Sequence, residues 1–518
     1  MDLRRPAKLA WWERAFPSVA LWHKRKRIQL EMAARVYDAA KGSSYHVAPT
    51  DARSGDAVME QAGDKIRKWA RHLDENHDLS IGILDVLVNN VVGAGITVEP
   101  MVMTKGGKPA DKVNKQIRKL WKDWSARPEV TGELPGGEMQ RLICRSWFRD
   151  GEVLIQHVRG TRFRHYSDVP YSVELIEADF LPFQALTGRD RVVHGVEKNA
   201  WGQPLAYWFY KQHPGNLLSF LPANPNDLRR APADDIIHLK LSRRIRQTRG
   251  VPIFHGVIRR LEDVKDYEES ERIAARVAAS LTAFIQKGED FTGELNAVAG
   301  DRSFEMQPGM IFDNLQQGEE VGMIKSDRPN QNLGEFVKSQ LRALAAGTGT
   351  NYSSISKDYN GTYSAQRQEL VESQPAYKRL QECFIETVMR RIHRELVTAA
   401  VAVGVVQLSR NVDPETLFDT DMRAPAIPWI DPMKETQADA LAVEKRFISR
   451  TQVIRNRGGD PNVVNEQIKK EREQDREDGF AGPDSGDGGN ENPGTGSDAE
   501  AGGDSDENGN TGDDAAAA

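Results

Sequence analysis

The residues whose types and spacing could perform covalent chemistry are Ser354 and Lys357, which form an SxxK motif. In this motif a lysine amine can take the proton of the serine hydroxyl, which makes the serine a nucleophile toward a carbonyl carbon. Serine and lysine are so common that about one such match is expected by chance in this length, and the companion SDN and KTG elements are absent. A serine hydrolase using Ser354 and Lys357 is therefore kept as the enzymatic alternative to a chain with no catalytic residues.

Metal, nucleotide and disulfide chemistry have no support in the residue spacing. The eleven histidines are scattered, HExxH is absent, and His194, His238 and His393 each stand alone within a predicted strand or helix. Two cysteines, Cys144 and Cys383, exclude a disulfide framework and a four-cysteine zinc site. The glycines of VVGAGI lack the GxGxxG spacing of a dinucleotide site, and no GxxxxGK[ST] loop occurs. The sequence predicts no metal and no cofactor.

The last part of the chain is strongly acidic. Residues 481–518 hold ten of the 76 acidic residues, none of the 70 basic ones and no aromatic side chain. Such a segment cannot bury enough apolar surface to offset its ordering entropy, so we expect disorder there. Without it, 70 basic residues face 76 less ten acidic ones, and the net charge changes from −6 to about +4. A nearly neutral body does not by itself indicate the concentrated basic face of a DNA-binding protein.

The first 30 residues are basic and aromatic. They hold eight Lys or Arg residues and two acidic ones, together with Trp11, Trp12, Phe16 and Trp22. A monomeric DNA-binding protein using this segment is the third function that we consider, and a lipid surface is another target for such a segment. The simpler interpretation is a terminal arm that packs on a neighbouring subunit or domain. No stretch reaches the roughly 18 apolar residues of a membrane span, so we expect a cytoplasmic protein or part of an assembly.

Helical spacing and strand-like segments alternate along the rest of the chain. Apolar residues recur at helical intervals from Ala57 to Val92, from Val113 to Trp124 and from Met139 to Asp150. Residues 151–242 form short β-branched and aromatic segments between turn residues, with a hairpin turn expected at Asn199 to Gly202.

A long helix and a long loop stand out in the second half. One apolar stripe predicts a helix from Val251 to Lys287, and a hairpin is expected around Gln317 and Gly318. A shorter helix follows, and then a loop of about 16 residues, GTGTNYSSISKDYNGTY, which is longer than most loops in compact domains. The next helix, Ser364 to about Val403, contains Pro375, which predicts a kink. Helices interrupted at Gly458-Gly459-Asp460-Pro461 end the ordered part.

Several blocks together resemble one family, in the order in which that family has them. They include NNVVGAGITVEP, GVEKNAWGQPLAYW, IIHLKLSRRIRQTRGVP, DVKDYEESERIAARVAASLTAFI, DRPNQNLGEFVKSQLRALAAGTGTNYSSISKDYNGTYSAQR and WIDPMKETQADALAVEKRFISRTQVIRNRGGDPNVVNEQ. Across about residues 20–475 the chain is similar to the lambda-type phage portal proteins. The acidic tail matches no part of that pattern.

The resemblance implies an α+β portal fold that assembles into a dodecameric ring at one vertex of the virion. Its implied partners are double-stranded DNA without sequence specificity, the terminase large subunit, head-completion and tail connector proteins, and capsid and scaffold proteins, with no membrane. The implied regions are a basic N-terminal arm, 1–30; a wing, helical and then β-rich, 31–250; an outgoing stem helix, 251–287; a clip, 288–330; a returning stem helix, 331–347; a tunnel loop, 348–363; a kinked wing helix, 364–415; a helical crown, 416–473; and an acidic disordered tail, 474–518.

The tunnel loop supplies the candidate site of this interpretation. We expect its side chains to line the narrowest segment of the channel, and the alternative is a surface loop at a contact between subunits. Since DNA must slide through the channel, weak repeated contacts to phosphates fit better than tight ones. The residues are Asn351, Tyr352, Lys357, Asp358, Tyr359 and Asn360.

Overall fold

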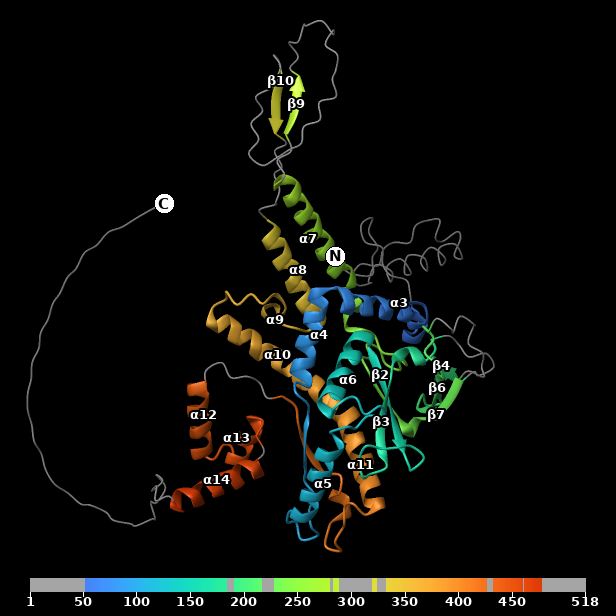
Figure 1. Ribbon diagram of the computed structural model, residues 1–518, viewed down its shortest axis with the longest axis vertical. Coiled ribbons are helices and arrows are strands. Elements are labelled where there is room, and N and C mark those ends of the chain that lie inside the picture. Colours follow the sequence, from blue (N-terminus) through green and yellow to red (C-terminus); the bar gives the residue numbers. More distant parts are fainter. Residues whose placement is uncertain are drawn as a thin grey trace, which may run out of the picture. The chain divides into compact units, whose positions relative to one another are not determined.

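The computed structural model describes residues 52–183, 191–216, 228–279, 283–287, 319–323, 332–425, 432–459 and 461–477. Described residues up to 425 belong to one compact unit, the body, and those from 432 onward to a second, the C-terminal unit. Helices and antiparallel sheets share the body, so the predicted mixture of helix and strand is confirmed (Figure 1). The predicted N-terminal arm lies outside the described residues. No described helix is both long and apolar enough to span a bilayer.

The first part of the body contains four helices, which occupy the three segments that the apolar spacing predicted as helical. They are α3 (Gly55–Asn76), α4 (Asp78–Val91), α5 (Asp111–Trp124) and α6 (Gly136–Asp150). The single helix expected from Ala57 to Val92 is wrong, because the chain is extended at His77, with φ −124° and ψ 114°. The Nε2 atom of His77 lies 2.9 Å from the carbonyl oxygen of Leu261, so a contact with a distant part of the chain holds the break.

Antiparallel strands follow α6, which confirms the predicted β-rich segment. Their bounds are β2 (Glu152–Arg159), β3 (Tyr171–Ile176), β4 (Val192–Val193), β5 (Val196–Lys198), β6 (Pro204–Tyr210), β7 (Leu228–Pro232) and β8 (Ile236–Lys240). One sheet has the order β3-β2-β8 and the other β4-β5-β6-β7. The predicted turn before β6 is confirmed, since Asn199 Oδ1 accepts hydrogen bonds from the amides of Trp201 and Gln203 at 3.0 and 2.9 Å.

The helix predicted from Val251 to Lys287 is shorter in the structure. A 3₁₀ turn, η5 (Ile253–Gly256), precedes α7 (Ile258–Ala279), and residues Ala283–Lys287 form strand β9. Pro252 lacks an amide hydrogen, so it cannot continue a helical hydrogen-bond pattern. Residues Ala283–Lys287 include Phe284 and Ile285, residue types that favour a strand, and β9 pairs antiparallel with β10 (Glu319–Met323). At 22 residues, α7 is about 33 Å long. The remainder of the predicted clip, including the turn at Gln317 and Gly318, lies outside the described residues.

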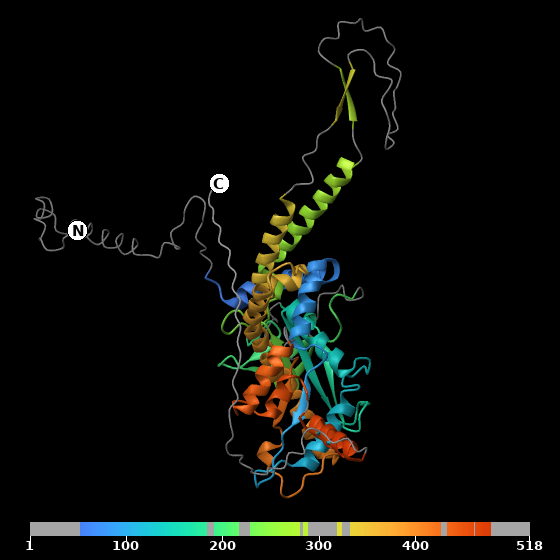
Figure 2. The ribbon, with the colours of Figure 1, turned by 90° about the vertical axis from the view of Figure 1, so that its left-hand side faces the viewer.

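The chain returns through helices that surround the predicted loop. These elements are α8 (Leu333–Thr348), α9 (Tyr352–Ser356), α10 (Tyr363–Phe384), the π-helical turn η6 (Ile385–Met389) and α11 (Arg390–Val403). Helix α8 lies beside α7 in both views, with the rings of Tyr267 and Phe336 4.8 Å apart (Figures 1 and 2). The helix continues through Pro375. The backbone first leaves the α-helical hydrogen-bond pattern ten residues later, at the π-helical turn η6.

The C-terminal unit is helical, as expected. It contains α12 (Pro432–Glu444), α13 (Arg450–Asn456) and α14 (Pro461–Glu477), with the predicted Gly-Gly break between the last two. The predicted limits of the crown, 416–473, need correction at both ends. Strand β11 (Thr420–Arg423) pairs with β1 (Thr97–Pro100) of the body, and α14 continues to Glu477, which moves the start of the predicted disordered tail beyond residue 474.

A fully buried ion pair joins the β-rich segment to the chain that enters α7. Glu152 opens β2 and Arg249 lies just before η5, and both side chains are completely buried. Arg249 Nε donates to Glu152 Oε1 at 2.6 Å, while its two terminal nitrogens donate to the carbonyl oxygens of Leu181 and Ala178, each at 2.8 Å. The guanidinium therefore has a partner on each nitrogen, which is what makes a buried charge tolerable.

The second oxygen of Glu152 is also occupied. It accepts hydrogen bonds from the Gly250 amide and from His238 Nε2, both at 2.9 Å. Burial alone would raise the pKa of the Glu152 carboxyl, but the charge of Arg249 and the hydrogen bond from His238 outweigh it and hold that pKa well below its usual range. Burial lowers the pKa of His238, so a neutral ring that donates through Nε2 fits the geometry.

We expect Glu152→Gln to lower the free energy of unfolding by about 3–5 kcal/mol, because it leaves the buried guanidinium without a counter-charge. Denaturant unfolding followed through the buried indoles of Trp124 and Trp147 measures this loss. The control is Glu197→Gln, which removes the carboxylate of an exposed pair with Arg230 and should lower the free energy of unfolding much less, because solvent screens that pair. Equal losses in the two variants would contradict the assignment.

Two buried histidines predict a pH dependence of stability. Burial lowers the pKa of both His157 and His393 to about 4. The Nδ1 atom of His157 lies 2.8 Å from the Tyr171 hydroxyl, and the ring of His393 lies beside that of Trp121. The unfolded chain therefore binds protons more tightly than the folded one, so stability is full above pH 6.5 and falls as pH drops toward 4. The thermal midpoint should fall between pH 7 and 4.5, and less steeply in His393→Gln. An unchanged slope in that variant would argue against a neutral buried ring.

Candidate functional site

The segment between α8 and α10, residues 348–363, begins inside the protein. Helix α8 ends at Thr348, and the next residue, Gly349, has a positive φ of +72° that lets the chain turn sharply. The hydroxyls of Thr348 and Thr350 are 2.8 Å apart, and the side-chain amide of Asn351 donates to Ser373 Oγ of α10 at 3.1 Å. Thr348, Thr350, Asn351 and Ser373 are all buried. The entry of the segment is therefore fixed to both flanking helices.

A short helix occupies the middle of this segment, which sequence analysis predicts as a loop throughout. Helix α9 is held by Glu369 of α10, whose carboxylate accepts from the Ser353 amide at 3.2 Å and from Ser353 Oγ at 2.6 Å. Ile355 buries its side chain on the inner face of α9. One charged acceptor and one apolar anchor thus order five residues that carry no helical apolar pattern in the sequence.

The tip of the segment, residues 357–360, is exposed but ordered by its own hydrogen bonds. Lys357 has φ +55° and ends α9, its amide donating to the Ser353 carbonyl at 3.0 Å. The Asp358 amide donates to Ser356 Oγ, and Asp358 Oδ1 accepts from the Asn360 amide, both at 3.2 Å. The side chains of Lys357, Tyr359 and Asn360 extend into solvent, with Tyr359 60% exposed.

The structure divides the six predicted channel residues into two groups. Lys357, Asp358, Tyr359 and Asn360 lie together at the tip, whereas Asn351 is buried and Tyr352 is partly buried. The Arg342 guanidinium lies 5.5 Å from the centre of the Tyr352 ring, and the Tyr352 hydroxyl donates to Asp358 at 3.4 Å. The tip can offer an amine, a phenol and an amide as hydrogen-bond donors, while Asn351 and Tyr352 support it from within.

The SxxK motif does not form a nucleophile and base pair in this geometry. Across the part of the chain that the structure describes, no hydrogen bond connects Ser354 Oγ with Lys357 Nζ. The neighbouring hydroxyls are already used, since Ser353 donates to Glu369 and Ser356 donates to the Tyr352 carbonyl at 2.8 Å. The arrangement supports structural roles for these serines and gives the hydrolase alternative no support.

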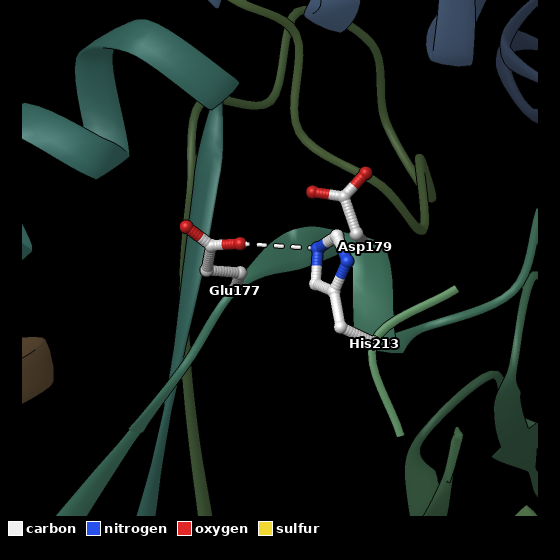
Figure 3. Close-up of side chains that lie close together, drawn as sticks. All are labelled: Glu177, Asp179 and His213. Carbon is white, nitrogen blue, oxygen red and sulfur yellow. Dashed lines mark ion pairs between the residues drawn. The ribbon is translucent and has the colours of Figure 1, made fainter. Parts of the chain in front are cut away.

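A second group of side chains, Glu177, Asp179 and His213, could be taken for a metal site, because their ligand atoms lie within 4.8 Å of one another (Figure 3). His213 Nε2 is 3.3 Å from Glu177 Oε2. Asp179, however, is already paired with two cations, Arg67 at 3.0 Å and Arg71. A divalent ion would have to displace these guanidinium groups or sit beside them, so the group is part of a salt-bridge network. Arg67 connects this network to Glu152, whose Oε1 atom is 4.0 Å from Arg67 Nη1.

Comparison with known proteins identifies the family of this chain. Residues 42–381 match the model of the phage portal protein, lambda family, which is more than half of the chain. The chain belongs to the lambda family of phage portal proteins. The match includes η5, α7, α8, α9 and all but the last three residues of α10, and therefore the whole candidate site.

Further similarities concern single proteins. A probable portal protein of Halomonas phage phiHAP-1 is 25% identical over 441 residues, which cover 82% of each chain. Among solved structures, a chain in the virion of a native gene transfer agent particle has a TM-score of 0.43 at 14% identity, covering 79% of this chain and 99% of that one. A chain in the neck of the native particle has a TM-score of 0.40 at 12% identity, covering 77% and 94%.

Sequence analysis does not single out the residues that stabilise this portal chain through long-range contacts. Glu369, Arg249 and Glu152 each act through partners far along the chain, and their charges resemble those of ordinary surface residues in the sequence. The one local signal is the TRGVP segment, in which an arginine precedes Gly250 and Pro252 at the entry to a helix.

We expect Glu369→Ala to loosen α9 without unfolding the body. Loss of a charged acceptor that serves two donors costs roughly 1.5–3 kcal/mol, which corresponds to amide exchange about 10–100 times faster in residues 352–357. Hydrogen exchange with mass spectrometry measures this rate. The matched control is Glu372→Ala, on the exposed face of the same helix, where exchange at 352–357 should not change. Equal effects of both variants would show that Glu369 does not hold α9.

Proposed function

We propose that copies of this chain form a closed ring at one vertex of a phage head and that double-stranded DNA passes through the ring during packaging and ejection. The single observation that carries this proposal is the family match over residues 42–381. The subunit number of twelve and the docking of the terminase large subunit, of head-completion and tail connector proteins, and of capsid and scaffold proteins follow from that membership. Assembly takes place in the host cytoplasm, and the ring stays in the virion.

The projecting pair α7 and α8 supports a ring (Figure 2). Helix α7 is a rod about 33 Å long, and its described hydrogen bonds to α3 and His77 are confined to its first two turns, at Leu261, Glu262 and Lys265. Much of the described surface beyond those turns is exposed. The open surface of α7 mixes charges of both signs with an apolar side chain, Ile273, that is 52% exposed. A ring of identical subunits would cover both sides of such a rod through one repeated interface.

The ordered tip at Lys357 to Asn360 supports a conduit. In the proposed ring these residues face the axis, as a return connection between α8 and α10 allows. One lysine per subunit gives evenly spaced single charges, which attract the phosphate backbone without reading bases. Because Asp358 lies between Lys357 and Tyr359, the contact is weak enough for the duplex to slide. The chain has no catalytic role in this proposal.

The conduit role predicts a separation of assembly from packaging. Lys357→Ala and Tyr359→Ala should leave rings of normal mass, because neither side chain has a hydrogen bond to the described body, and should lower the number of DNA-filled heads several-fold. Ring mass is measured on purified protein and filled heads are counted from infected cells. Lys378→Ala, an exposed lysine of α10, serves as the control. Normal packaging by intact rings of both variants would contradict a role of this tip in the conduit.

A further inference from the structure

Helix α5 presents two opposite faces of different chemistry. Its buried face consists of Val113, Ile117, Leu120 and Trp124, which pack into the main core of the body. Successive spacings of three, four and three residues place another set of side chains on the far side of the helix. These are Lys112, Lys115, Lys119 and Lys122, all exposed, and we call them the lysine stripe. The stripe is about 15 Å long.

The charges of the lysine stripe are not neutralised within the body. Asp111 and Asp123 lie at the two ends of α5, at helical spacing from Lys115 and Lys119, yet no ion pair joins any stripe lysine to another described residue. Other helices of the chain pair their charges, as Lys68 does with Asp64 at 2.7 Å and Arg390 with Glu386 at 2.7 Å. Four like charges on one face repel one another, which costs stability unless an anion is bound.

The hairpin that leads into α5 extends the same charge. Lys105 and Lys108 are both exposed there, and they too lack a described ion-pair partner. The hairpin is held in place, since the Thr104 amide donates to the Lys108 carbonyl at 2.8 Å and the Lys105 amide donates to the Asn411 carbonyl at 2.9 Å. The stripe therefore continues onto a second, fixed element.

We propose that the lysine stripe binds the phosphate backbone of double-stranded DNA, at a contact separate from the tip at Lys357 to Asn360. Within the body, α5 lies at the end opposite to α7 and α8 in both views (Figures 1 and 2). Lysine ammonium groups are point charges that contact phosphates and read no bases. The proposal rests on the proposed function only in that DNA is present near the ring.

Charge density makes duplex DNA a better ligand for the lysine stripe than the acidic tail of the chain, which is the other anion considered. Duplex DNA carries one charge per roughly 1.7 Å of its axis, so about nine lie along a 15 Å stripe. The acidic residues of the tail are only ten, spread over residues 481–518 among glycines, and binding them would also require ordering that segment. A strong contact would arrest DNA inside a channel, whereas outside it such a contact can hold packaged DNA that does not slide.

Salt dependence of DNA binding tests the proposal. The full chain is titrated into a labelled 30-base-pair duplex, at a series of salt concentrations, and affinity is read from fluorescence anisotropy. Replacing all four stripe lysines with Gln should reduce the slope of log affinity against log salt by about 3–4, since each phosphate contact contributes about 0.9. The basic segment 1–30 is present in both proteins, so the difference reports α5. Duplexes of different sequence should bind equally.

A matched pair of double variants controls for general loss of positive charge. Lys115→Gln with Lys119→Gln should reduce the slope by about 2. Lys469→Gln with Lys470→Gln removes two charges from α14, where the lysines stand among Glu466, Glu471 and Glu473, and should leave the slope nearly unchanged. Equal effects of the two pairs would overturn the assignment to α5.

Three further results would overturn the proposal, each in a distinct way. An unchanged slope in the fourfold variant, with normal ring mass, removes DNA from the stripe and leaves the conduit standing. DNA binding that appears only after deletion of residues 481–518 would show that the acidic tail is the ligand of the stripe. Loss of the ring in the fourfold variant assigns it to contacts between copies. Absence of rings in the unsubstituted chain, with the slope difference intact, contradicts the proposed function and supports the stripe.

Discussion

The buried pair of Arg249 and Glu152 is the interaction on which the arrangement of the body depends. It joins the first residue of β2 to Arg249, four residues before η5, and through Leu181 and Ala178 it also holds the connection after β3. His238 of β8 completes the set from the neighbouring strand. The segment of chain that leads into α7 is therefore anchored by a charge pair that is fully buried from solvent. Because removing either partner would leave an uncompensated buried charge, this junction resists partial opening.

After that junction the chain forms, in sequence order, the elements of the proposed conduit. Helix α7 leaves, α8 returns beside it, and α8 leads the chain into a segment whose entry is buried and whose short helix α9 is held by Glu369. The exposed side chains at the tip thus stand on an ordered base fixed to two helices. Such a base suits a channel lining, since side chains on a loose loop would be carried along by a moving duplex. Helix α5 places its lysines on a different part of the same body, and its core is continuous with that of α4, α6 and α11.

The sequence predicts those features that depend on local spacing. The apolar positions of α5 and α6, the turn at Asn199 and the end of α13 before Gly458 all follow from periodicity and turn chemistry. Features set by distant partners are not predicted: the break at His77 needs Leu261, β9 needs β10, and α9 needs Glu369. Asn351 has the polarity of a channel residue but is used to bind Ser373, which only the fold reveals. The lysine stripe is readable from the sequence, but an average charge near zero conceals it.

Electron microscopy of the purified full chain, free of capsid, tests the central claim most directly. A ring-forming portal protein should appear as closed annular particles with an axial hole wide enough for a duplex, with α7 and α8 of adjacent copies side by side. Twelve copies per ring is the expected number. Compact single-copy particles that persist at high protein concentration would contradict the claim, because a chain that stays alone cannot enclose DNA.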